Sequence, residues 1–83
     1  MDSVSRQTEA FLRALAVVLK NARKRHGLSQ IELAVRSGLS QSHISLVEKA
    51  LRWPSSESVK RIAIALETSA ADLIAAAERN AGS

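Results

Sequence analysis

Apolar residues recur every three to four positions along most of the chain, and this spacing places them on one face of a helix. The pattern is clearest where Leu12, Leu15 and Leu19 line up against basic residues on the opposite side. Glycine, proline and serine interrupt it. Helical segments are expected over about 5–26, 30–37, 40 to 51 or 52, from 55 or 56 onward, and from 69 onward. The pattern therefore predicts an all-α fold of five helices, with residues 1–83 forming a single domain.

The segment 29–51 is predicted to contain two short helices joined by a tight turn. Gly38 follows the first of them and supplies the positive φ that such a turn requires. Ala34 is small enough for a close helix crossing, and Ile44 can pack the second helix onto the first. This arrangement is a helix-turn-helix, whose second helix enters the major groove of DNA.

Serines are placed to begin both helices of this segment. Ser29 and Glu32 form a Ser-x-x-Glu capping box, and Ser40 directly follows Gly38-Leu39. The turn between the helices is then only about three or four residues long. A small helical bundle without a DNA-binding role is the alternative, and it would require the spacing, the glycine and the caps to coincide by chance.

The composition favours a polyanionic partner and an aliphatic core. Hydrophobic residues make up 46% of the 83 residues but aromatic residues only 2%, so the core must be built from Leu, Ile, Val and Ala. Twelve Lys and Arg against eight acidic residues give a net charge of +4. The N-terminus lacks a basic signal region and the apolar run 14–19 is too short to span a membrane, so no membrane association and a cytoplasmic location are expected.

Catalytic and metal-binding chemistry is not indicated. The chain has no cysteine, which excludes disulfides and thiolate metal sites. His26 and His43 are far apart in the sequence and have no carboxylate placed to complete a metal site. Because there is also no nucleophile elbow, phosphate loop or carboxylate pair, we expect no enzyme, no cofactor and no small-molecule ligand.

A longer pattern runs from about residue 15 to residue 73. It comprises Arg23 four positions before Gly27, GLSQIELA at 27–34, SGLSQSHIS at 37–45, Glu48, Pro54, IAIAL at 62–66, Ser69 and Leu73. With these residues the chain resembles the lambda-repressor-like helix-turn-helix regulators of the Xre type, and in size the stand-alone restriction–modification controllers. The resemblance implies a compact five-helix DNA-binding domain, with residues 1–14 as an N-terminal helical extension. It also implies a homodimer on a palindromic operator in double-stranded DNA, as in phage-type repressors.

The expected recognition helix presents a polar face. At about 100° per residue, Ile44, Val47 and Leu51 share one side of this helix. The residues expected to read bases lie on the other side and at its start, and they are Gln41, Ser42, Ser45 and Leu46. The Gln41 carboxamide can bond adenine N6 and N7 together. Leu46 has two readings, contact with a thymine methyl group or a place at the edge of the core.

Further side chains are candidates for phosphate or groove contacts around that face. They are Gln30, Ser40, His43, Lys49, Arg52 and Arg36, with Gln30 and Arg52 assigned through the family resemblance. For each Lys or Arg, a solvated surface charge is an equal alternative. Trp53 has two readings as well, packing on the domain or lying near the DNA backbone.

The resemblance pairs Arg23 with Glu48 as a structural ion pair that fastens the recognition helix. Many family members have glycine where this chain has Ala50 and Glu67. A left-handed conformation is costly for other residues, so we expect the helices to end differently there.

The dimer interface is predicted from apolar side chains that point away from the core stripes. They are Ile64, Ala71 and Ile74. Phe11 and Leu12 could pack on the last helix or extend this interface.

An alternative function is an antitoxin, in which the same fold binds a toxin protein and autoregulates its operon. That function needs a partner-binding tail, and the tail here is short and rich in alanine.

Overall fold

The structure is a computed structural model that describes residues 2–82. In this range the chain forms five helices and no strand: α1 Ser3–Arg25, α2 Gln30–Ser37, α3 Gln41–Glu48, α4 Ser56–Ala65 and α5 Ala70–Ala81. The predicted all-α class is confirmed. The first residue of the 1–14 extension lies outside the described residues, Asp2 is the N-cap of α1, and residues 3–14 form the first part of this unbroken helix.

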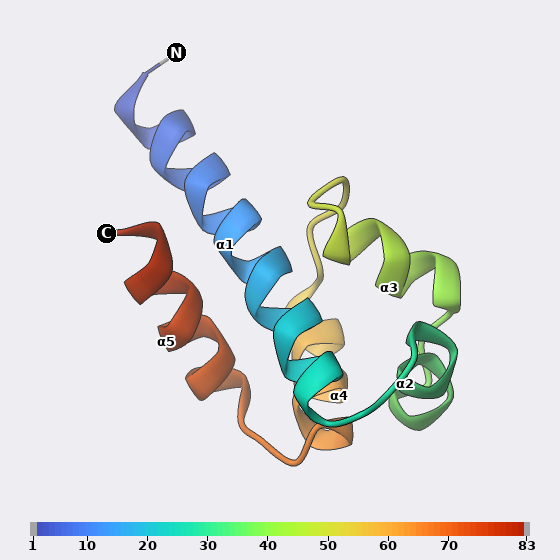
Figure 1. Cartoon of the computed structure of the whole chain (residues 1–83). Helices are drawn as coiled ribbons and strands as arrows, with labels where there is room; N and C mark the ends of the chain where they lie inside the picture. Colours follow the sequence, from blue (N-terminus) through green and yellow to red (C-terminus); the bar gives the residue numbers. More distant parts are fainter. Residues whose placement is uncertain (1, 83) are drawn as a thin grey trace.

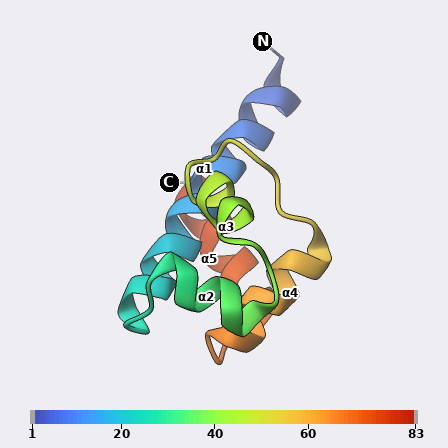
Figure 2. The same cartoon turned by 90° about the vertical axis from the view of Figure 1, so that its right-hand side faces the viewer.

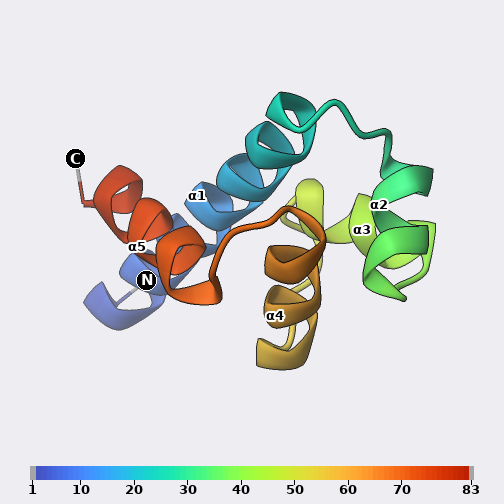
Figure 3. The same ribbon diagram turned by 90° about the horizontal axis from the view of Figure 1, so that it is seen from below.

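The long helix α1 separates two parts of the molecule. Helix α5 runs back beside α1 on one side, while α2 and α3 lie on the other (Figures 1 and 3). Helix α4 contacts both α2 and α5. This arrangement leaves α3 at the edge of the molecule, with one side against α1 and α2 and the other facing outward.

The core is aliphatic, as the composition predicts. Its largest fully buried side chains are Leu19, Leu33, Ile44, Val47 and Ile62, and Leu73 and Ala77 add the contribution of α5. Among the described residues, no buried side-chain nitrogen or oxygen lacks a hydrogen-bond partner. The helices are therefore held by one continuous cluster of interlocking aliphatic side chains.

Polar side chains begin every helix. The predicted serine caps are present: Ser29, Ser40, Ser55 and Ser69 each accept a hydrogen bond from the backbone N–H three residues on. The capping box of Ser29 and Glu32 is formed in both directions. Asp2 caps α1 in the same manner, and α1 consequently starts at Ser3, before the expected residue 5.

The ends of the first four helices confirm the predicted glycine turn at Gly38 and correct the expectation at the two non-glycine positions. Each closes on a residue with positive φ, and these residues are Gly27, Gly38, Ala50 and Glu67. In each case the next N–H donates to the carbonyl five residues back, for example Leu51 to Leu46 at 3.0 Å. The expectation that the helices end differently at the two non-glycine positions is thus wrong. Satisfying carbonyls that the helix end would leave unpaired offsets the local strain.

The left-handed turn at Ala50 also displaces Leu51. We expected the third helix to reach residue 51 or 52 with Leu51 on its core face, but α3 ends at Glu48 and Leu51 is 72% exposed. The reversal of φ at Ala50 turns the chain outward before Leu51 can continue the apolar stripe.

Replacing Ala50 with glycine is expected to raise the free energy of unfolding by about 1 kcal/mol, because glycine has no Cβ to clash at positive φ. Urea denaturation followed by circular dichroism would measure the change. Gly38→Ala is the matched reverse control: it places a Cβ at a φ of 73° and 2.8 Å from Arg61 Nη1, and it should destabilise the fold. A less stable Ala50→Gly variant would show that the strain is absent.

Candidate nucleic-acid interface

The outward side of α3 carries the four residues expected to read bases. Gln41 and Ser42 are exposed, Ser45 is half-buried, and Leu46 is 37% exposed. The same four side chains line a shallow surface hollow of about 420 Å³. In Figure 2, α3 lies at the front of the molecule with α2 beside it. The described chain therefore leaves this face open to a partner.

Leu46 is the apolar member of this face. Its side chain is accessible to a partner, whereas its neighbour Val47 is 1% exposed. An exposed apolar side chain in this position is suited to contact with a thymine methyl group.

The inward side of α3 is fastened to α1 by an ion pair. The Arg23 Nε donates to Glu48 Oε2 at 2.7 Å, and Arg23 Nη2 donates to Glu48 Oε1 at 2.9 Å. The two side chains are only 9% and 4% exposed. Arg23 Nη1 also donates to the Leu28 carbonyl at 2.8 Å. This two-point pairing fixes the rotation of α3 as well as its position.

Gln30 is the third member of this cluster. Its Nε2 donates to Glu48 Oε1 at 3.1 Å, so the carboxylate joins α1, α2 and α3. Burial raises the pKa of Glu48, but the hydrogen bonds from Arg23 and Gln30 and the positive charges of Arg23 and Lys20 outweigh it and hold that pKa below its usual value. Hydrogen bonding to Glu48 raises the pKa of Arg23. Both groups are therefore charged at neutral pH.

His43 lies on the flank of α3 that faces α4. Its Nε2 is 3.1 Å from Ser58 Oγ, and the Ser55 hydroxyl donates a hydrogen bond to the same Ser58 Oγ. Burial and the nearby positive charge of Arg52 lower the pKa of His43. The ring is half-buried and is directed to α4 instead of the outer face.

The other candidates for phosphate contact surround α3. Ser40 is exposed at its N-terminus, where its Oγ accepts the His43 N–H. Lys49 and Arg52 are exposed just after its C-terminus, and Arg36 is exposed on the last turn of α2. The interface thus has a neutral polar centre with cations at its margins.

Two contacts near this interface could not be predicted from the sequence. Arg61 Nη1 of α4 donates to the Ser37 carbonyl at the end of α2, at 3.2 Å. The rings of Phe11 and Trp53 stack with their centroids 6.2 Å apart. Trp53 therefore packs on the domain, which is the first of the two interpretations offered by the sequence. Both contacts join segments that are far apart in the sequence, and helix periodicity does not specify how such segments pack.

The residues predicted for a dimer interface are all at the surface. Ile64 on α4 is 64% exposed, Ile74 on α5 is 40% exposed, and Ala71 is exposed on the first turn of α5. The helices that carry them are in contact. Within residues 2–82, no helix combines the length and apolar character needed to cross a membrane.

The comparisons with known proteins agree with this geometry. A family model described as helix-turn-helix matches residues 19–73. A crystal structure of the clp gene regulator ClgR from Corynebacterium glutamicum superposes with a TM-score of 0.81 and 29% identity, over 87% of this chain and 77% of that one. A second structure of ClgR from C. glutamicum gives a TM-score of 0.78 and 30% identity, over 84% and 90% of the two chains. No curated protein sequence matches the chain.

Proposed function

This chain belongs to the Xre and lambda-repressor-like helix-turn-helix family of DNA-binding transcription regulators, and from that premise we propose that it recognises a short palindromic operator as a homodimer. The observation that carries the proposal is the open polar face of α3, lined by Gln41, Ser42, Ser45 and Leu46 and held from behind by the Arg23–Glu48 pair.

Base reading would come from the first turns of α3 in the major groove. Gln41 is the residue best placed to hydrogen-bond adenine, because it is exposed at the first position of the helix. Ser42 and Ser45 would bond base edges with little discrimination, and Leu46 would contact a thymine methyl group.

Phosphate contacts would position the domain on the duplex. Lys49, Arg52 and Arg36 supply cations, and Ser40 supplies a hydroxyl at the N-terminus of α3. Gln30 begins α2, where backbone N–H groups favour an anion, but its side-chain amide already donates a hydrogen bond to Glu48. His43 would reach phosphate through Nδ1, since Nε2 is engaged with Ser58.

The dimer would form through the exposed apolar side chains of α4 and α5. A two-fold axis there would place the recognition helices about 34 Å apart, one turn of DNA. Because dimer formation would then limit operator binding, the regulator would respond to its own concentration, as phage-type repressors and restriction–modification controllers do.

A charge placed in the proposed interface tests the homodimer. The double variant Ile64→Lys, Ile74→Lys is expected to sediment as a monomer and to bind the full operator about 100-fold more weakly, because two linked half-site contacts become one. Val35→Lys is the matched control, since Val35 is 78% exposed on α2, outside the proposed interface. An unchanged dimer in the double variant would place the interface elsewhere.

A further inference from the structure

The aromatic stack joins the N-terminal extension to the loop that follows α3. Phe11 and Trp53 are the only aromatic residues of the chain, and their rings are 19° from parallel. Phe11 precedes the 19–73 region matched by the family model, whereas Trp53 lies inside it. The extension therefore adds a contact to the helix-turn-helix domain from outside the matched region.

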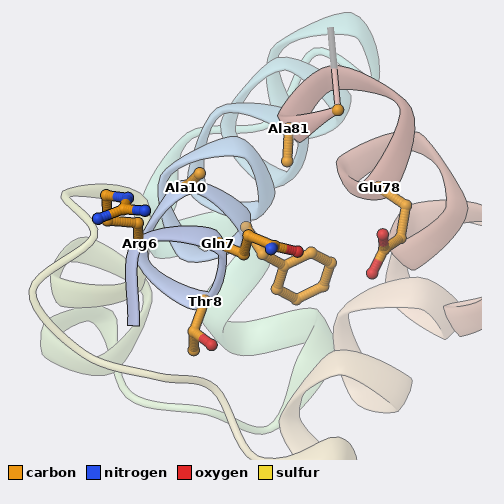
Figure 4. Close-up of a pocket in the computed structure, with 8 residues that line it drawn as sticks. Arg6, Gln7, Thr8, Ala10, Glu78 and Ala81 are labelled. Carbon is orange, nitrogen blue, oxygen red and sulfur yellow. The ribbon is translucent and has the colours of Figure 1, made fainter. Parts of the chain in front are cut away.

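Neither ring is part of the buried core. Trp53 is 46% exposed, and Phe11 is only partly buried against the core. Phe11 also lines an open cleft of about 600 Å³ between the start of α1 and the end of α5. Figure 4 shows this cleft, with Gln7, Thr8 and Ala10 on the α1 side and Glu78 and Ala81 on α5. Truncating Phe11 would thus widen an open surface instead of creating a sealed void.

In the proposed function, Arg52 of the loop 49–55 contacts DNA. The first half of this loop is held by backbone hydrogen bonds from Ala50 to Val47 and from Leu51 to Leu46. Arg52 follows and is exposed, with its charge close enough to act on His43. Trp53 comes next, so the stack anchors the loop one residue beyond Arg52.

We propose that Phe11 is a positioning residue for operator binding, which anchors Trp53 so that the 49–55 loop presents Arg52 to a DNA phosphate. The inference rests on the proposed function. A loop fixed at both sides of Arg52 loses less conformational freedom on binding than a loop fixed at one side. The role of Phe11 is thus exerted through Arg52 and not through a contact with DNA.

A double-mutant cycle tests this coupling. Operator affinity is measured over a range of salt concentrations for the wild type, Phe11→Ala, Arg52→Ala and the double variant. Phe11→Ala should weaken binding roughly fivefold to tenfold and lower the slope of log K against log salt by about 0.9, the loss of one phosphate contact. In the Arg52→Ala background, the Phe11 substitution should have no further effect, because the two act as one unit.

The emission of Trp53 monitors the stack directly, since it is the only tryptophan. It should shift to longer wavelength in Phe11→Ala, while Phe11→Tyr should keep both the wild-type emission and the wild-type affinity. Val17→Ala is the control on α1, because Val17 is 52% exposed and is not part of the stack. Should Phe11→Ala fail to fold by circular dichroism, Phe11→Leu replaces it in the same cycle.

The possible outcomes distinguish failure of this inference from failure of the proposed function. Additive losses in the cycle, or full affinity with a red-shifted Trp53, would overturn the positioning role while leaving operator binding intact. A wild-type protein that binds no duplex would instead contradict the proposed function.

Discussion

Glu48→Ala is expected to lower the free energy of unfolding by about 3–5 kcal/mol, because it leaves the Arg23 guanidinium buried without its counter-charge. Gln30 would lose its acceptor at the same time. Thermal or urea denaturation measures the effect. Base preference should change much less than stability, since Glu48 lies on the side of α3 that faces α1. A folded variant with an unchanged melting temperature would contradict this role.

The exposed ion pair of α4 supplies the matched control. Glu57 pairs with Arg61 at 3.1 Å, but the two side chains are 74% and 47% exposed. Glu57→Ala should therefore cost no more than about 1 kcal/mol. A similar cost for both variants would mean that burial of the Arg23–Glu48 pair has no special importance.

The buried Arg23–Glu48 pair also predicts how the stability of the fold depends on pH. The pKa of Glu48 is lower in the folded protein than in the unfolded chain, so the folded state binds fewer protons. The stabilisation is complete above the pKa of an unfolded glutamate, near 4.3, and is lost as the pH falls through the lower folded value. The Glu48→Ala variant should lack this part of the acid transition.

Gln41→Ala is expected to relax the preference at one base pair of each half-site by about 1–3 kcal/mol, because the bidentate contact to adenine is lost. Competition binding with operators that differ at single positions measures the change. Affinity for the other positions and the salt dependence should stay close to those of the wild type.

Gln7→Ala serves as the control for a glutamine-to-alanine change, because Gln7 is an exposed residue of α1. If Gln41→Ala weakens binding to every duplex equally, Gln41 is a backbone anchor and the base-reading assignment is wrong.

Helix starts and glycine turns could be predicted from the sequence because their causes are local. A serine hydroxyl reaches the backbone N–H three residues on, and Gly38 adopts positive φ freely. Ala50 and Glu67 could not be predicted in this way. Their conformation follows from closing the helix end against the core, and no local preference of alanine or glutamate indicates it.

The candidate site was predictable in part. Helical periodicity placed Gln41 and Ser42 away from Ile44, and the structure has them exposed while Ile44 is 1% exposed. Arg23 and Glu48 were paired by family resemblance, since their separation of 25 residues carries no signal of contact. The stack of Phe11 on Trp53 depends on where the start of α1 passes the loop after α3, which only the assembled fold specifies.

Selection of bound sequences from random duplexes tests the central claim most directly. We predict enrichment of an inverted repeat whose half-site centres lie about one DNA turn, 10–10.5 base pairs, apart. Affinity for this sequence should fall steeply with salt. Recovery of duplexes with no shared sequence, at any salt concentration that permits binding, would contradict base recognition by the exposed face of α3.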